Sequence, residues 1–269
     1  MASWWKTSVP GEPRTIDLNA DVGEAGDAAG IAVERALIDL VTSVHIACGG
    51  HAGDEGSMRA TVEAAREHGV QVGAHPSYPD RAGFGRRPMA MTNGELSSAL
   101  RAQLTSLMDV AASVGVTVDS VKPHGALYGE VGRDEAKCEL LLGVLSELFG
   151  PQIALVLPAG APAVSWAADA GVRVLQEGFA DRAYTSDGEL LTRQVPGSVY
   201  SDPALAAAQA LGLAVDGRVA THDGVTLSLP VGTLCVHGDS PGAVAMARAV
   251  RRALIDAGVA IAAPAVRHP

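Results

Sequence analysis

The sequence lacks any continuous apolar run of the roughly 18 residues that a membrane-spanning helix needs, so no such span is expected. Its beginning also lacks a basic region followed by an apolar stretch, the pattern of a secretory signal peptide. Residues 1–14, which include Trp4 and Trp5, instead predict a loose N-terminal arm.

Cysteine is scarce: Cys48, Cys138 and Cys235 are odd in number and widely spaced. They form neither a disulfide framework nor a CxxC zinc motif. We therefore expect reduced thiols in a cytoplasmic protein.

Positive charge is also in short supply. Lys and Arg total 20 against 30 for Asp and Glu, a net charge of −10. This balance disfavours binding to nucleic acid or to an anionic membrane surface. Three local motifs are missing as well: the P-loop GxxxxGK[ST], the metalloprotease HExxH, and a dinucleotide-binding glycine fingerprint after the first strand.

Short segments that are often apolar on both faces and are bounded by Gly or Pro recur along the chain and predict strands of a parallel sheet covered by helices. The predicted strands are Thr15–Ala20, Val44–Cys48, Val70–Ala74, Asp119–Lys122, Ile153–Leu157, Val172–Gln176 and Thr233–Val236.

Helical patterns lie between these strands. Thr92 and Glu95 have the spacing of a capping box, and leucines follow at intervals of three and four residues. Further helices are expected over residues 55–68, ending at Gly69, and over 133–149. The last helix is expected to follow the cap Asp239-Ser-Pro241 and to end at Gly258.

Seven strand–helix repeats without a dividing linker predict one domain over residues 15–269, an α/β fold with a closed parallel (β/α) barrel of seven strands. An open doubly wound sheet is the alternative. A small β-hairpin is expected around residues 218–230, where His222-Asp-Gly supplies a turn.

Polar residues follow six of the predicted strands. In a barrel of this type the loops after the strands meet at one rim, where chemistry takes place. Convergence on the rim favours a functional role for His75, His124 and His237 together, whereas His45, within its strand, is interpreted as a core residue. Asp54 and Asp239 are equally interpretable as helix caps. Residues 81–87 suggest a shaped lid.

Two chemistries fit such a cluster. Carboxylate and imidazole groups can hold a divalent ion that activates water. The same groups without metal can act as general acid and base around a carbonyl, with Lys122 stabilising an oxyanion or a substrate carboxylate.

Six motifs in order carry a family resemblance: LNADVGE, ACGGHAGD, GAHPSYPDRAGFGR, VKPHGALY, EGFADRAY and CVHGD. Over residues 16–259 the chain resembles the lactam-utilisation (LamB/YcsF) family, to which the A component of bacterial 5-oxoprolinase belongs. The resemblance implies a TIM-like barrel of the glycoside hydrolase/deacetylase type. It also implies ATP-dependent opening of 5-oxo-L-proline (pyroglutamate) to L-glutamate with partner subunits B and C, ATP being a co-substrate accompanied by magnesium.

The resemblance implies site residues in three roles. The implied catalytic residues are Asp21, His51, His75, Lys122, His124, Glu177 and His237. The implied substrate-binding residues are Asn19, Asp181, Arg182 and Asp239. A weaker similarity of the first motif to carbohydrate deacetylases implies metal ligation by Asp21, His75 and His124. Gly50 departs from the family, in which an aromatic residue often precedes the histidine, and this departure predicts a wider pocket near His51.

Two other functions fit the same residues. One is a stand-alone metal-dependent deacetylase or amidase that needs no ATP. The other is a noncatalytic subunit that presents the small molecule to its partners.

Overall fold

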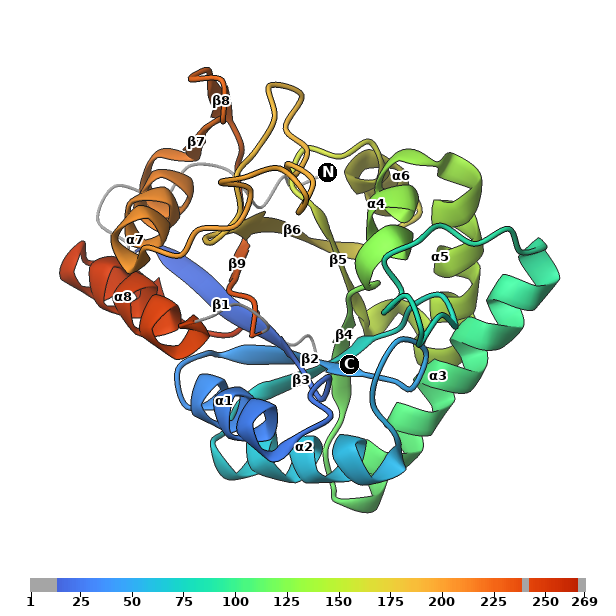
Figure 1. The fold of residues 1–269 in the computed structure, drawn as a ribbon. Coiled ribbons are helices and arrows are strands. Elements are labelled where there is room, and N and C mark those ends of the chain that lie inside the picture. The colour runs from blue at the N-terminus through green and yellow to red at the C-terminus, as the bar shows by residue number, and fades with distance from the viewer. Residues whose placement is uncertain (1–13, 239–241, 266–269) are drawn as a thin grey trace.

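A parallel β-barrel forms the centre of the computed structural model, which describes residues 14–238 and 242–265 (Figure 1). Its seven strands are β1 (Thr15–Val22), β2 (Ser43–Ala47), β3 (Gln71–His75), β4 (Val118–Val121), β5 (Ala154–Pro158), β6 (Arg173–Phe179) and β9 (Thr233–Cys235). Strand β9 pairs with both β6 and β1, which closes the barrel. The predicted fold and all seven predicted strands are therefore confirmed. A short strand unforeseen in the sequence, β10 (Ala260–Ile261), extends the sheet beside β1.

Helices surround the barrel (Figure 1). They are α1 (Ala28–Ile38), α2 (Glu55–Glu67), α3 (Asn93–Ser113), α4 (Gly125–Arg133), α5 (Glu135–Phe149), α6 (Ala163–Asp169), α7 (Pro203–Leu211) and α8 (Ala243–Asp256), with short helical turns at Gly150–Gln152 and Gly212–Asp216. The predicted capping box at the start of α3 is present. Asp54 caps α2 with Ser57, as its position after β2 suggested. No helix of residues 14–238 and 242–265 is long and apolar enough to cross a membrane.

Alternation along β1 explains how this barrel holds both a core and a site. Successive side chains of a strand point to opposite faces. Ile16, Leu18, Ala20 and Val22 belong to the hydrophobic core, whereas Asp17, Asn19 and Asp21 make polar contacts with the neighbouring strands β2, β4, β6 and β9 or the residues beside them. Asp17, Asn19 and Asp21 therefore form a polar row along β1, and Asp21 lies nearest the carboxyl end of the strand. Truncating a buried core leucine such as Leu18 would cost about 2–5 kcal/mol.

The longest excursion from the barrel lies between β6 and β9. The predicted hairpin is present as β7 (Arg218–Ala220) paired antiparallel with β8 (Thr226–Ser228). Residues 180–202 form an irregular segment that is pinned by isolated bridges from Arg182 to Val199 and from Tyr184 to Leu190. The expected N-terminal arm, apart from Arg14, and the expected cap at Asp239 lie outside the described residues.

Candidate functional site

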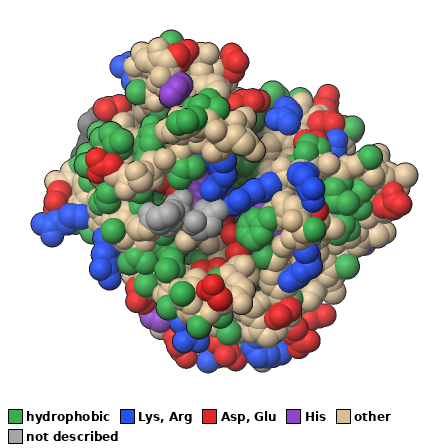
Figure 2. All heavy atoms as spheres, viewed as in Figure 1, with side chains coloured by type: hydrophobic (Ala, Val, Ile, Leu, Met, Phe, Trp, Pro, Cys, Tyr) green, Lys and Arg blue, Asp and Glu red, His purple; other side chains and the backbone are tan. Residues whose placement is uncertain are grey.

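Three histidines and one carboxylate meet where β1, β2, β3 and β4 end. His75 is the last residue of β3, His51 follows β2, and His124 precedes α4. Their donor atoms and a carboxylate oxygen of Glu24 all lie within 4.8 Å of one another. We call Glu24, His51, His75 and His124 the histidine–glutamate cluster. Figure 2 shows the barrel face with a hollow near its centre, in which acidic and histidine side chains are visible.

Backbone carbonyls fix the orientation of two of these rings. Nδ1 of His75 lies 2.7 Å from the carbonyl of Lys122, and Nε2 of His124 lies 2.9 Å from the carbonyl of Phe84. A carbonyl only accepts hydrogen bonds, so each of these nitrogens carries its proton. The remaining nitrogens, Nε2 of His75 and Nδ1 of His124, face each other at 2.9 Å. Two neutral rings would oppose lone pairs there, so the pair requires a proton or a metal ion.

Glu24 supplies the negative charge of the cluster. Its Oε1 lies 2.9 Å from Nε2 of His51, 3.3 Å from Nδ1 of His124 and 3.8 Å from Nε2 of His75. Burial raises the pKa of Glu24, but hydrogen bonds to His124 and His51 outweigh it and the net shift is downward. Oε1 of Glu34 accepts from the backbone N–H groups of Glu24 and Ala25, which holds this turn in place.

Glu24, the last residue of the motif LNADVGE, is not among the site residues expected from the sequence, for which Asp21 is the implied metal-binding carboxylate. In the structure Asp21 lies 3.5 Å from His75 but is bonded to Lys122. Glu24 reaches all three histidines because Gly23, with φ of +75°, turns the backbone beyond the strand. The signal was present in the glycine before the acid, since a left-handed position ends the strand and redirects the next side chain.

A second polar group, centred on Lys122, lies inside the barrel. Its Nζ donates to Asp21 at 3.0 Å and to Cys235 at 3.3 Å, and it lies 2.8 Å from Oε1 of Glu177. Asn19 Nδ2 also donates to Glu177 at 3.0 Å, and the hydroxyl of Tyr128 donates to its other oxygen at 2.7 Å. All of these residues are buried.

The charges of this group are unequal. Although burial lowers the pKa of Lys122, the two carboxylates and Cys235 raise it well above its usual range, so the amine stays charged. Burial raises the pKa of Asp21, but Lys122, His45 and His237 together outweigh it, and the net shift is downward. The pKa of Glu177 is raised by burial despite the same lysine. Of the two carboxylates, Glu177 is therefore the one that accepts a proton more readily.

His237 and Asp181 form a dyad at the end of β9. Asp181 is buried, and its two carboxylate oxygens lie 3.0 and 3.1 Å from Nδ1 of His237. The ring stacks on Phe179 with a centroid distance of 5.4 Å. A carboxylate holding Nδ1–H leaves Nε2 as a base, the arrangement by which aspartate orients histidine in hydrolases.

Arg182 is buried at the edge of this region. Its Nε donates to the carbonyl of Ser198 and its Nη2 to the carbonyl of Leu191, so these atoms brace the segment after β6. His45, interpreted from the sequence as a core residue, is buried and contacts Ser120 at 3.2 Å and Asp21 at 3.8 Å. It thus lies beneath the site rather than among nonpolar side chains.

The loop of residues 80–87 covers the histidine–glutamate cluster. Phe84 has a left-handed backbone with φ of +54°, and its ring meets His51 and His124 edge-on. Gly85 lies so close to these histidines that a Cβ there would come within 3.0 Å of each. Nη1 of Arg81 binds the carbonyls of Gly49 and Gly53, which fixes the turn that carries His51. The shaped covering loop expected from the sequence is present.

Gly50 does not widen the pocket near His51, and that prediction was wrong. A Cβ at Gly50 would lie 2.3 Å from Oε1 of Gln103 and 2.5 Å from Oγ of Ser77. The amide of Gln103 is buried and bonded to the backbone N–H and carbonyl of Ser77. The space beside Gly50 is thus filled by α3.

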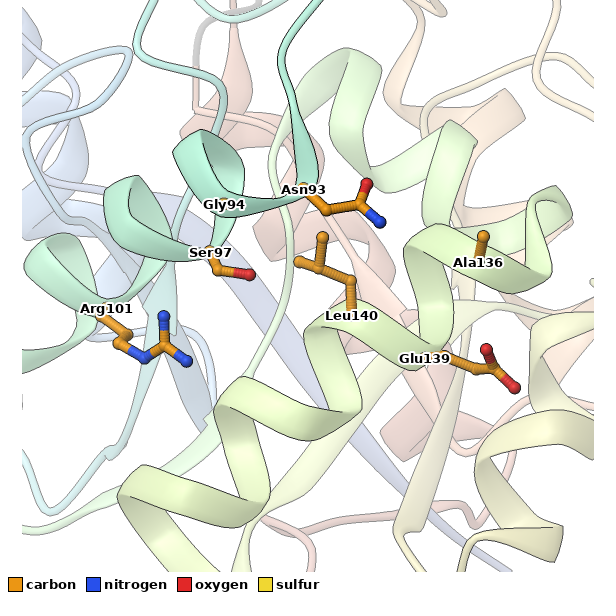
Figure 3. A pocket seen from close by; sticks show the side chains of 7 residues that line it. All are labelled: Asn93, Gly94, Ser97, Arg101, Ala136, Glu139 and Leu140. Carbon is orange, nitrogen blue, oxygen red and sulfur yellow. The ribbon is translucent and has the colours of Figure 1, made fainter.

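A groove of about 550 Å³ lies elsewhere, between α3 and α5 in the outer helical layer. Figure 3 shows its lining residues: Asn93, Gly94, Ser97, Arg101, Ala136, Glu139 and Leu140. None of them belongs to the histidine–glutamate cluster or the Lys122 group. Clustered acids, bases and histidines mark a site better than an open groove does, so we place the candidate site at the barrel rim.

Comparisons with known proteins show the family of the chain. The LamB/YcsF family model matches residues 16–268. The chain is 45% identical over 250 residues to the 5-oxoprolinase A component of Methylococcus capsulatus, covering 93% of this chain and 96% of that protein. It is also 45% identical to the 5-oxoprolinase A component of Paracidovorax citrulli, covering 91% and 98%.

Solved structures share the fold. The lactam utilization protein of Thermus thermophilus has a TM-score of 0.85 and 40% identity, covering 93% of this chain and 100% of that one. A putative cellobiose-phosphate cleavage protein of Enterococcus faecalis shares the fold at 14% identity, with a TM-score of 0.58 over 93% of this chain and 97% of that one. With the family model matching nearly the whole sequence, the chain belongs to the LamB/YcsF family.

Proposed function

We propose that this chain is the A component of an ATP-dependent 5-oxoprolinase, which opens 5-oxo-L-proline to L-glutamate together with partner subunits B and C. The observation that carries the proposal is the name of its relatives, which are A components of 5-oxoprolinase, at 45% identity over nearly their full length. The rim of carboxylates, histidines and lysine supports it with suitable chemistry. The proposed compartment is the cytoplasm, in keeping with three free, buried thiols.

The need for ATP follows from the substrate. A five-membered lactam is an unstrained amide whose hydrolysis near neutral pH favours the closed ring. Transfer of a phosphoryl group from ATP to the amide oxygen would activate the carbonyl carbon. Water then adds to that carbon, and the C–N bond breaks as the nitrogen takes a proton, which leaves an acyl phosphate. A second water attacks the acyl phosphate, and its C–O bond to phosphate breaks to give the carboxylate of glutamate and inorganic phosphate. Because this sequence has no P-loop motif, we assign nucleotide binding to the partner subunits or to other contacts.

His237 is the base we assign to the water. Asp181 holds its Nδ1, and the side chain is 15% exposed, compared with 1% for Asp181, so Nε2 is the accessible atom of the dyad. Lys122 is bonded to two carboxylates and Arg182 to two backbone carbonyls, so both side chains already hold neighbouring segments in place. We therefore assign both to holding the site in shape.

The histidine–glutamate cluster fits a divalent metal ion. Three imidazoles and a carboxylate are a donor set that suits zinc and other first-row metals. The carbonyls behind His75 and His124 fix the two rings, as hydrogen-bond partners of metal-binding histidines commonly do, and the facing nitrogens call for a cation. The proposed ligands are thus Glu24, His51, His75 and His124, with Glu24 in place of Asp21. A bound ion would supply Lewis-acid polarisation of the reacting carbonyl.

The test is reconstitution of the chain with its partner subunits, followed by measurement of glutamate and ADP. We expect glutamate only when all subunits, ATP and 5-oxoproline are present, with ADP formed in proportion. Hydrolysis of 5-oxoproline by this chain alone, indifferent to ATP, would overturn the proposal and favour the stand-alone amidase, which the histidine–glutamate cluster also suits.

A variant distinguishes the catalytic role from that of a noncatalytic subunit that presents 5-oxoproline to its partners. Glu24→Gln in the assembled complex should abolish turnover while 5-oxoproline still binds. Full turnover by that variant would instead favour the presenting role.

A further inference from the structure

We propose that Asp17 and Thr233, deep in the barrel, are positioning residues that set the orientation of Asn19 and thereby the placement of Glu177. Neither Asp17 nor Thr233 belongs to the rim, and neither was selected from the sequence. The activity part of the inference rests on the proposed function, whereas its structural part does not.

All described hydrogen bonds to the carboxylate of Asp17 come from hydroxyl groups. Its carboxylate accepts from Thr42 at 2.7 Å, from Ser43 at 2.8 Å and from Thr233 at 2.6 Å. The residue is 3% exposed. A buried carboxylate is costly unless it is hydrogen-bonded, so these donors account for its presence. Each hydroxyl has a single proton. Asp17 is the described acceptor for the hydroxyls of Ser43 and Thr233 and the nearer of two acceptors for Thr42, whose hydroxyl also lies 3.2 Å from the carbonyl of Leu18.

The direction of the Thr233 hydroxyl decides the direction of the Asn19 amide. Because Thr233 donates to Asp17, its oxygen can only accept from Asn19, whose Nδ2 lies 2.7 Å away. The second Nδ2 proton goes to Glu177 at 3.0 Å. A flipped amide would set Oδ1 against the hydroxyl lone pairs and the carboxylate, which is unfavourable on both sides. The network therefore fixes which atom of Asn19 is nitrogen.

The orientation of Asn19 matters because it completes the contacts of Glu177. Oε1 of Glu177 faces both Nδ2 of Asn19 and Nζ of Lys122, and Oε2 accepts from Tyr128. Since Lys122 lies between Glu177 and Asp21, a shift of one carboxylate moves the ammonium relative to the other. The series Asp17–Thr233–Asn19–Glu177–Lys122 thus connects the depth of the barrel with the rim.

Substitutions at Thr233 and Ser43 separate this role from general stability. Thr233→Val keeps the shape and removes the hydroxyl that joins Asp17 to Asn19. Ser43→Ala removes another donor to Asp17, whose hydroxyl has no described hydrogen bond to Asn19 although Ser43 lies beside it on β2. Thr233→Ser restores the hydroxyl. In the assembled complex with 5-oxoproline and ATP, we expect Thr233→Val to lower kcat about 10- to 100-fold, as loss of supporting contacts does at other sites, with KM nearly unchanged. Ser43→Ala and Thr233→Ser should keep kcat within about twofold of the unsubstituted complex.

A second readout does not depend on activity. The side-chain amide protons of Asn19, observed by NMR with selective asparagine labelling, should both be protected from exchange in the unsubstituted chain. Thr233→Val should lose protection of one proton, and Ser43→Ala should keep both. Equal effects of Thr233→Val and Ser43→Ala on kcat, or two unprotected protons in the unsubstituted chain, would overturn the inference. If Thr233→Val does not fold, the protection of the Asn19 amide protons in the unsubstituted chain still tests the inference.

If the unsubstituted complex turns over no 5-oxoproline, the proposed function fails. The NMR measurements on this chain then still test the positioning role.

Discussion

Nδ1 of His124 lies 2.9 Å from Nε2 of His75, while the other nitrogen of each ring hydrogen-bonds a backbone carbonyl. If both rings are neutral, the two facing nitrogens carry lone pairs and no proton, so they cannot form a hydrogen bond with each other. This relationship, together with the adjacent carboxylate of Glu24, is the reason for proposing a metal at the rim.

The first prediction concerns that metal. The purified chain should bind about one divalent ion per molecule, measured by elemental analysis after dialysis. A chelator should lower the melting temperature, and zinc should restore it, because an ion that binds the folded state stabilises it. Glu24→Gln should weaken metal binding by more than about tenfold. Glu147→Gln is the control, because Glu147 forms an exposed ion pair with Arg101, and it should leave metal binding unchanged. A chain that holds no ion and melts identically with chelator would contradict the metal assignment.

Lys122 provides a second prediction, because it is the shared cation of two buried carboxylates. Lys122→Met should destabilise the fold by about 3–5 kcal/mol, since Asp21 and Glu177 lose their counter-charge. Without the lysine, burial raises the folded pKa of both acids above the unfolded value, so stability falls as pH rises. The melting-temperature deficit of the variant should be larger at pH 8 than at pH 5. A deficit that does not change with pH would count against the charge argument.

His45 leads to a prediction about acid stability. Burial, aided by Lys122, lowers the pKa of His45 from 6.5 to about 3. The unfolded chain therefore binds the proton first, and stability that is complete above the unfolded pKa is lost as pH falls below it. The resulting loss of unfolding free energy reaches about 4 kcal/mol as the pH falls to the folded pKa.

His45→Gln should consequently flatten the fall in unfolding free energy between pH 7 and pH 4, measured by urea titration. His222→Gln, in the exposed hairpin turn, serves as the matched control and should leave the slope unchanged. Indistinguishable slopes for His45→Gln and the unsubstituted chain would exclude His45 as a source of acid sensitivity.

Gly50 supports a packing prediction. Gly50→Ala should cost about 1–3 kcal/mol because the new Cβ meets Gln103 and Ser77. Combined with Gln103→Ala, the loss should be smaller than the sum of the single losses by at least about 0.5 kcal/mol. Gly94→Ala, where a Cβ meets nothing within 4 Å, is the control and should be nearly neutral. Additive losses would contradict the prediction, because they would mean that the clash with Gln103 does not contribute to the loss at Gly50→Ala.

The sequence predicted the seven strands well, because strand length, apolar composition and bounding glycines are local signals. It also identified most of the rim, since residues after parallel strands share one end of a barrel. Three-dimensional closure decides the pairings, which local patterns do not reveal. Asp21 is bonded to Lys122, which follows β4, and reaches only His75 of the three histidines, whereas Glu24 reaches all three. The role of Gly50 depended on Gln103, more than fifty residues later in α3.

The positioning role of Asp17 was also beyond the sequence. The alternation of polar and apolar residues in β1 does not reveal the partners of Asp17, because its three hydroxyl donors come from residues at β2 and β9. The same holds for Asp181, which the resemblance placed among substrate-binding residues and which the structure pairs with His237.

The central claim is that this rim is the reacting centre of an ATP-coupled lactam hydrolase. Its most direct test is the rate of glutamate formation by the assembled complex carrying Glu24→Gln, beside the unsubstituted complex and an Asp54→Asn control at the exposed cap of α2. We predict ATP-dependent glutamate formation by the unsubstituted and control complexes, and a loss of at least about 100-fold for Glu24→Gln, the order expected for removing a group that acts at the reacting centre. Equal rates for all three complexes, or glutamate formed without ATP, would contradict this claim.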